Sequence, residues 1–170
     1  SYSAFSGSGL TEVIVPSSVK SIGTYAFSSC QHLAKATLPN TLTTIADGMF
    51  SGSALEEFEM PDSLVTVYPE AFANCGSLER VSWNEKVQHL DDAAFKDCSS
   101  LTEVVLPDST WFLGKSVFEN CDALTKAHLT SFVTDLGSRA FADCDSLTDI
   151  KLGLGLTNIS SEAFRHCDTL

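Results

Sequence analysis

The sequence of 170 residues is poor in basic side chains and contains no long apolar run. Lys and Arg number 10 against 22 Asp and Glu, which gives a formal net charge of −12. This charge removes the attraction to phosphate on which nucleic-acid binding depends, so DNA, RNA and anionic membrane surfaces are unfavoured partners. No apolar run approaches the roughly 20 residues that span a bilayer, and residues 1–10 lack the basic and apolar regions of a signal peptide. We expect no direct membrane insertion of this segment.

A 23-residue repeat runs through the whole chain. Leucines recur at intervals of 22 or 23 residues, and each of the first seven opens the pattern LxxVxLPxxLxxIgxxAFxxC. The phenylalanine of this pattern occurs eight times, as Phe5, Phe27, Phe50, Phe72, Phe95, Phe118, Phe141 and Phe164. One repeat can bury little apolar surface alone, whereas stacked copies give each Leu and Phe a neighbour above and below. The period therefore predicts a solenoid.

The pattern within one repeat predicts an α/β, β-rich coil. Apolar residues at the third and fifth positions after the leucine alternate with polar ones, as in a short strand. Proline follows the strand in several repeats and helps to end it, although Asn84, Thr130 and Gly153 stand at this position elsewhere. The AFxxC stretch is too short for a long helix. We expect it to form a single helical or 3₁₀ turn on the outer side.

These residues resemble the BspA-like branch of the leucine-rich repeats, whose unit carries the same LP, IgxxAF and CxxL features. The match covers essentially residues 1–170, which we interpret as a single domain of about seven repeats. The resemblance implies a horseshoe with a parallel, strand-lined concave face. Because neither end carries a cap, we expect a segment of a longer array, with further repeats at both ends.

The six cysteines share one repeat position, which argues against both disulfides and metal binding. They are Cys30, Cys75, Cys98, Cys121, Cys144 and Cys167. Adjacent copies should stack with nearly parallel Cβ vectors about 4.8 Å apart, farther than the roughly 3.8 Å that a disulfide prefers. Zinc needs four converging ligands, and no CxxC pair occurs. Buried free thiols are the favoured interpretation, with disulfides as the main alternative. In two shorter repeats, Gly7 and Gly52 fall where cysteine is expected.

Charges of alternating sign occupy the second position after each leucine, which points outward from the predicted strand. This row is Glu12, Lys35, Glu57, Arg80, Glu103, Lys126 and Asp149. One interpretation is a cross-strand ion ladder that serves solubility and register. The other is a mixed-charge binding surface on the concave face, joined by Ile14 and Val105 and by the polar fourth-position residues Thr37, Glu59, Ser82, His128 and Lys151.

Trp111 and Phe112 form a second candidate contact, because neighbouring repeats carry polar residues at these outward positions. Exposed aromatic side chains can anchor an interface. The alternative is that Trp111 turns inward to fill the space left by Thr110 at a normally apolar position. Trp83 falls at an inward position and is interpreted as core. His32, His89, His128 and His166 fall at unrelated repeat positions, which indicates surface roles and no metal or catalytic pair.

No nucleophile, base and orienting residue converge in the repeat map, so we predict a non-enzymatic protein-interaction module without a cofactor or metal. The family resemblance implies a secreted or cell-surface adhesin that binds a protein or glycoprotein of a host or neighbouring cell. The alternative is a structural scaffold subunit docked permanently in a larger assembly, inside or outside the cell. If the concave face binds the partner, reversing Arg80 should weaken binding more than reversing Lys96 in the outer turn.

Overall fold

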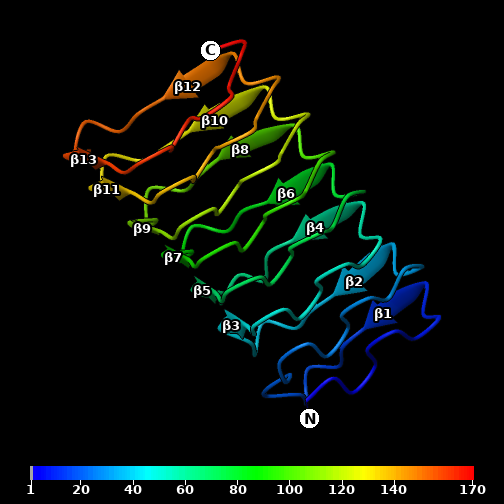
Figure 1. The fold of residues 1–170 in the computed structure, drawn as a ribbon. Helices are drawn as coiled ribbons and strands as arrows, with labels where there is room; N and C mark the ends of the chain where they lie inside the picture. Colours follow the sequence, from blue (N-terminus) through cyan, green and yellow to red (C-terminus); the bar gives the residue numbers. More distant parts are fainter. Residues whose placement is uncertain (1) are drawn as a thin grey trace.

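Successive coils of the chain stack in sequence order, with the two termini at opposite ends of the stack (Figure 1). The structure, a computed structural model, describes residues 2–170. A complete coil carries a three-residue strand on one side and a two-residue strand on the other, and strands of neighbouring coils pair in parallel. The strands are β1 (Glu12–Ile14), β2 (Lys35–Thr37), β3 (Thr44–Ile45), β4 (Glu57–Glu59), β5 (Thr66–Val67), β6 (Arg80–Ser82), β7 (His89–Leu90), β8 (Glu103–Val105), β9 (Phe112–Leu113), β10 (Lys126–His128), β11 (Asp135–Leu136), β12 (Asp149–Lys151) and β13 (Asn158–Ile159).

The three-residue strands β1, β2, β4, β6, β8, β10 and β12 form what we call the strand face. In each strand the middle residue points inward and the two flanking residues point outward, as the period of two requires. Hydrogen-bonded pairing divides this row into three groups, β1–β2, β4–β6 and β8–β10–β12. The two-residue strands form the second face, in which β3–β5–β7–β9 and β11–β13 are separate groups.

The predicted helical or 3₁₀ turns are wrong, because residues 2–170 contain no helix. The outer side of each coil is instead a run of tight turns with two residues at positive φ, such as Glu70 (56°) and Asn74 (59°). The amides of Glu70, Phe72 and Asn74 donate to carbonyls of the next coil over 2.8 to 3.0 Å. A helix would use every amide within its own segment, whereas here alternate amides bond between coils.

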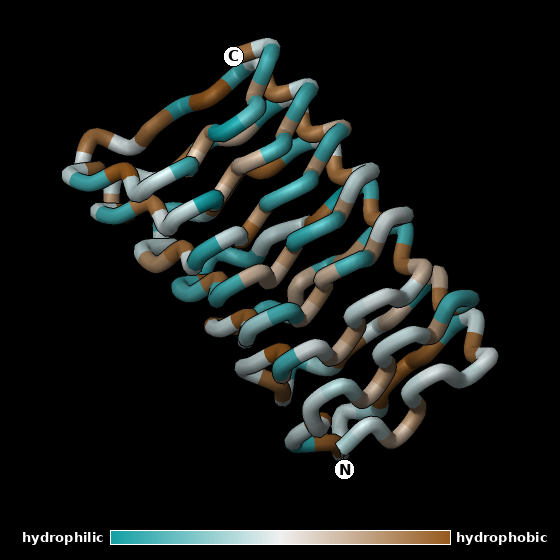
Figure 2. Tube along the Cα trace, viewed as in Figure 1, coloured by the Kyte–Doolittle hydropathy of each residue, from teal (hydrophilic) through white to brown (hydrophobic). Residues whose placement is uncertain are grey.

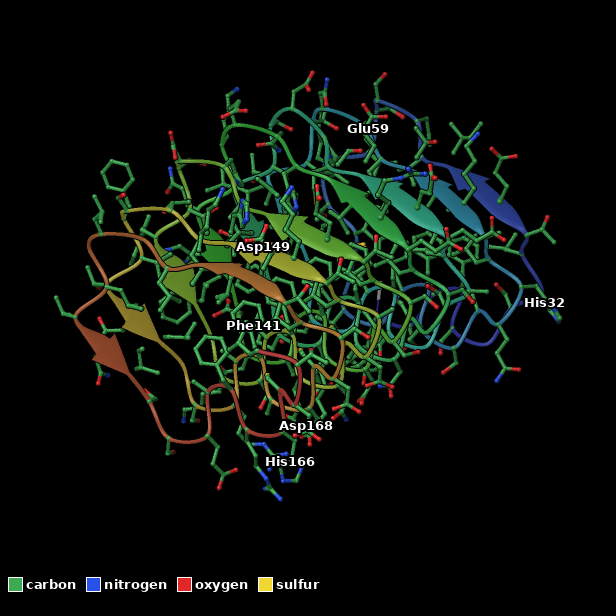
Figure 3. All side chains as sticks on the ribbon, turned by 90° about the horizontal axis from the view of Figure 1, so that it is seen from above. His32, Glu59, Phe141, Asp149, His166 and Asp168 are labelled. Carbon is green, nitrogen blue, oxygen red and sulfur yellow. The ribbon has the colours of Figure 1, made fainter. Side chains whose placement is uncertain are left out.

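The core lies between the two faces and the outer turns. The eight phenylalanines form a continuous stack, with ring centroids of successive coils 4.9 to 5.7 Å apart and interplanar angles of 5° to 20°. Figure 3 shows Phe141 inside the coil and Glu59, His32 and His166 at its periphery. Apolar and polar stretches alternate along the coils, with weaker contrast in the coils near the N-terminus (Figure 2). The predicted stacking of apolar residues is thus present throughout.

Candidate functional site

The outward residues of the strand face lie where the sequence predicts. Both flanking positions of nearly every strand are exposed, and only Lys126 and His128 of β10 are half-buried. Beneath them the middle residues, such as Phe58 and Val104, are buried or half-buried. The face therefore presents two columns of variable side chains on a backbone that is held by the core.

The charged row forms discrete pairs rather than a continuous ladder. Lys35 pairs with Glu12 at 3.5 Å, Lys126 pairs with Glu103 at 2.9 Å, and Arg80 pairs with Glu57. Each pair joins strands that share backbone hydrogen bonds, and the sheet opens between the pairs. Exposed pairs of this kind contribute about 0.2 to 1 kcal/mol each. These ion pairs thus help to fix the register of the paired strands, and their charged side chains remain partly exposed to solvent.

The last member of the row, Asp149, departs from the predicted rung-by-rung pattern. Its carboxylate contacts Nε2 of His128 at 2.9 Å, although Lys126 is its partner in strand register. Lys126 contacts Glu103 instead, on the other side of β10. The pairing at this end therefore runs diagonally between the two outward columns.

A surface cavity of about 490 Å³ lies where the strand face opens between β2 and β4. Its lining brings together the candidate residues Lys35, Thr37, Glu57, Glu59 and Ser82. The amide of Glu56 still donates to the carbonyl of Ala34 at 3.2 Å, but the strand residues beyond it are not paired. Five of the predicted site residues therefore border one hollow, whereas the residues of β10 and β12 lie apart from it.

Trp111 and Phe112 point outward, so the inward alternative for Trp111 is wrong. Trp111 is 48% exposed and Phe112 is 37% exposed. Thr110 itself fills the inward position: it is fully buried, and its hydroxyl donates to the carbonyl of Val87 at 2.8 Å. The polar side chain is tolerated there because a backbone acceptor lies within reach.

The sequence prediction missed the partners of these aromatic residues. The imidazole of His89 lies 4.3 Å from the Trp111 ring, centroid to centroid, at an interplanar angle of 85°. His89 also faces Phe112 in the register of β7 and β9. The signal is present in the sequence, since residues 89 and 112 are one repeat apart and therefore stack on adjacent coils.

The cysteines are free thiols in one row. Five are buried and Cys167 is half-buried. Each Sγ atom donates to the carbonyl of a phenylalanine in the stack, 25 or 26 residues earlier, at 3.1 to 3.4 Å. Burial raises the pKa of the Cys75 thiol to about 11 and that of Cys144 to about 12. Such thiols are weak nucleophiles, so the row is structural.

The two shorter repeats place serine, not glycine, at the thiol position. The hydroxyl of Ser53 is buried and lies 3.4 Å from Sγ of Cys75, and Ser8 lies at the same distance from Cys30. Gly7 and Gly52 instead adopt positive φ, 68° and 69°, like Asn74 one residue before Cys75. The expectation that these glycines replace cysteine is therefore wrong by one residue.

Trp83 packs inward as predicted, edge-on against Phe95 at 5.5 Å. Its indole Nε1 is buried without a hydrogen-bond partner in the described chain.

Within residues 2–170, no group of three or more His, Cys, Asp or Glu side chains is arranged to hold a metal ion. These residues also hold no apolar helix of the length that a membrane span requires. The histidines take separate places, His166 contacting Asp143 at 3.1 Å.

Parallel strands on both sides of the coils from β2 onward and a repeated leucine and phenylalanine core define a leucine-rich-repeat solenoid. The sequence matches the family described as BspA type leucine rich repeat region, in six copies, over residues 1–125 and 66–170. The chain belongs to this family. Its fold is typical of protein interaction, and proteins of this kind are typically non-enzymatic. Among curated protein sequences no match was found.

Solved bacterial proteins share the fold. A leucine rich repeat protein of T. pallidum, TpLRR, superposes with a TM-score of 0.86 at 27% identity over 94% of this chain and 78% of that one. A leucine rich cell surface protein of Faecalibacterium prausnitzii gives 0.59 at 28% identity over 95% and 52%. The pneumococcal vaccine antigen PcpA gives 0.60 at 21% identity over 86% and 51%. The chain thus spans about half of the latter two proteins.

Proposed function

We propose that this chain is the repeat domain of a secreted or cell-surface protein that binds another protein or glycoprotein through the strand face. The observation that carries the proposal is the pair of exposed columns on this face. They vary in charge and size from coil to coil, while the residues beneath them stay apolar. A rigid base with variable outward residues suits recognition of an extended partner surface.

The hollow between β2 and β4 is the part of the strand face best suited to a contact. Its lining carries Lys35, Glu57 and Glu59 beside the inward-facing Ala36 and Phe58. Charged groups around a recessed apolar floor favour an ordered docking geometry, because the apolar floor gives affinity and the charges fix orientation. A partner with basic groups opposite the two glutamates would complement it.

A surface location is supported by the F. prausnitzii relative, which is described as a cell surface protein and is 28% identical to this chain. Adhesion to a host or neighbouring cell is the role we propose at that location. Intact source cells are treated with a non-permeant protease, and peptides of this region are followed by mass spectrometry with a cytosolic protein as lysis control. We expect release from intact cells. Protection until lysis would contradict the proposal and point to an internal assembly.

A screen of immobilised cell-surface glycoproteins first identifies a partner that binds this chain. Charge reversals in this chain then test whether the strand face carries that binding. Arg80→Glu removes the ion pair with Glu57 and places a third carboxylate beside Glu57 and Glu103. Lys96 is unsuitable as the control, because its ammonium lies 3.3 Å from the buried carboxylate of Glu119. Lys86→Glu is the matched control, since Lys86 is exposed outside the strand face and has no ion-pair partner within residues 2–170.

We expect Arg80→Glu to weaken binding about tenfold, as loss of a charged contact at an interface does, and Lys86→Glu to leave it unchanged. Thermal melts are measured in parallel, because some destabilisation by Arg80→Glu follows from like charges on adjacent strands. Equal losses for the two variants would place the interaction outside the strand face. A loss that parallels unfolding would remove the support for Arg80.

A further inference from the structure

Three aromatic rings gather on the second face, on the side of the coil away from the strand face. His89, Trp111 and Phe112 lie within 4.3 to 6.1 Å of one another, centroid to centroid, on the adjacent strands β7 and β9 and the residue before β9. The contact with His89 fixes the indole while nearly half of Trp111 stays exposed. A cluster of exposed aromatic rings, unlike a single exposed side chain, marks a candidate interaction site.

The sheet of the second face opens directly beside this cluster, between β9 and β11. One coil further on, the amides of Thr157 and Ser160 donate to Thr134 and Leu136 of the preceding coil at 2.8 and 3.0 Å. The equivalent amides of Thr134 and Gly137 have no such backbone partner in the described residues. A surface cavity of about 350 Å³ occupies this place, and its lining includes Trp111 and Phe112. In this part of the described chain, the opening therefore leaves the carbonyls of Trp111 and Leu113, which would accept these amides, free to accept a hydrogen bond from a ligand beside the aromatic rings.

The charges at the cavity are predominantly negative. Asp92 and Asp135 line it together with one basic residue, Lys115. One oxygen of Asp92 accepts the backbone amide of Lys115 at 2.8 Å, and one oxygen of Asp135 accepts the Thr134 hydroxyl at 2.7 Å. Neither carboxylate has an ion-pair partner within residues 2–170. Each keeps a second oxygen for an incoming donor.

We propose that this cavity binds a lysine or arginine side chain presented by a partner protein. A cation over the face of an indole is attracted by the ring quadrupole, most strongly for tryptophan. The carboxylates of Asp92 and Asp135 supply negative charge for an ion pair with the ligand cation, which the aromatic rings alone cannot form. The net charge of −12 also attracts basic partners in general. Anionic ligands are disfavoured by the same charges. The site lies away from the strand face and does not depend on the function proposed there.

The test uses the 170-residue chain and the peptide acetyl-Gly-Arg-Gly-Arg-Gly-amide, with citrulline in place of arginine as the neutral control. Binding is followed by NMR at the indole N–H of Trp111, because the other tryptophan, Trp83, has a buried Nε1 and serves as an internal reference. We expect the arginine peptide to shift the Trp111 signal and the citrulline peptide to bind at least about fivefold more weakly. Raising NaCl to about 0.5 M should weaken the arginine peptide.

Three variants locate the site. Trp111→Ala should weaken binding of the arginine peptide about fivefold, measured by backbone shifts around the cavity, and Asp135→Asn should weaken it about threefold. Lys115→Ala should strengthen it about twofold, because it removes the one positive charge of the lining. Tyr68→Ala is the matched control, since Tyr68 is a 40% exposed aromatic residue that does not line the cavity. It should leave binding unchanged.

Equal binding of the arginine and citrulline peptides would overturn the proposal, and so would a Tyr68→Ala effect as large as that of Trp111→Ala. Binding of a neutral oligosaccharide such as maltohexaose, with loss in Trp111→Ala and no response to Lys115→Ala, would replace it with a saccharide site. The strand-face variant Arg80→Glu should leave peptide binding unchanged. The two proposals can therefore fail separately.

Discussion

The thiol of Cys98 donates a hydrogen bond to the carbonyl oxygen of Phe72, with Sγ 3.2 Å from the oxygen. The same carbonyl accepts the backbone amide of Cys75 at 3.2 Å. The contact recurs in every repeat that carries the cysteine, so in these repeats the thiol links the outer turn to the phenylalanine row of the coil before it. The carbonyls of Phe5, Phe50, Phe72 and Phe95 thus receive a second donor beside a backbone amide, as buried polar groups require.

The first prediction concerns the reactivity of these thiols. In the folded protein at pH 8, iodoacetamide should label Cys167 first and leave Cys75, Cys98, Cys121 and Cys144 unlabelled. Burial raises their pKa values, to about 11 for Cys75 and well above the ordinary value for Cys98 and Cys121. Only about one Cys75 thiol in a thousand is then ionised at pH 8.

Labelling is read by mass spectrometry in buffer and again in about 6 M urea, where all six thiols should react alike as unfolding exposes them. Cys167 differs because it is only half-buried, although burial still raises its pKa. Fast labelling of Cys98 in buffer, at the rate seen in urea, would contradict the buried arrangement. Failure of any thiol to react in urea would instead indicate a disulfide.

The second prediction concerns the buried carboxylate of Glu119, which lies 2.7 Å from Arg139 and 3.3 Å from Lys96. Burial alone would raise its pKa, but the hydrogen bond from Ser116 and the charges of Lys96 and Arg139 outweigh burial and lower the pKa below its ordinary value of 4.5. A carboxyl group with a lowered folded-state pKa stabilises the fold above its unfolded-state pKa. This contribution is lost as the pH falls through the folded-state value.

Glu119→Gln should therefore lower the free energy of unfolding by about 1 to 3 kcal/mol at pH 7, and by less at pH 3, which lies below the ordinary pKa of 4.5. Urea denaturation at the two pH values measures the difference. Glu85→Gln is the control, because Glu85 is exposed and forms no ion pair within the described residues. A penalty for Glu119→Gln that is the same at both pH values would assign the effect to packing rather than to charge.

The period of the sequence was sufficient to predict the solenoid, the phenylalanine stack and the outward columns of the strand face. It could not predict the outer turns, because the letters AFxxC do not show that Glu70 and Asn74 take positive φ or that alternate amides bond to the next coil. The direction of Trp111 depended on one hydroxyl, that of Thr110, finding the carbonyl of Val87. The openings between β2 and β4 and between β9 and β11 could not be predicted, because the same repeat pattern continues across them.

The third prediction tests the role of Thr110. Thr110→Val should change the free energy of unfolding by no more than about 1 kcal/mol, because the side chain keeps its shape and the Val87 carbonyl still accepts the hydroxyl of Ser109 at 2.7 Å. Val133→Thr, one coil further on, should cost about 1 to 3 kcal/mol. The new hydroxyl would replace a methyl group at a fully buried position. It would also have to share the equivalent acceptor, the carbonyl of Thr110, with the Thr130 hydroxyl, which lies 2.7 Å away. Equal losses in thermal melts would contradict this account.

The fourth prediction concerns Gly153, which stands where most repeats carry proline. A Cβ atom built on Gly153 would lie 1.7 Å from the carbonyl oxygen of Thr130, so the two backbones can approach only without a side chain. Gly153→Ala should therefore force the last coils apart and lower the free energy of unfolding by about 1 to 3 kcal/mol. Gly9→Ala is the matched control, because a Cβ atom there would meet no atom within 4 Å.

The Gly9→Ala control also accounts for the effect of a glycine-to-alanine change on the unfolded state. Replacing glycine by alanine restricts the unfolded state and can stabilise a protein by about 0.4 to 1 kcal/mol where the folded conformation accepts the new side chain. Gly9→Ala should show this gain or no change, and Gly153→Ala should show a loss, so urea denaturation of the two variants should differ in sign or in size. Amide hydrogen exchange should then report faster opening in residues 149–170 of Gly153→Ala and unchanged protection around Phe72, because neighbouring coils of a solenoid can open locally. Similar stability and exchange for both variants would mean that the approach of Gly153 to Thr130 does not hold the last coils in place.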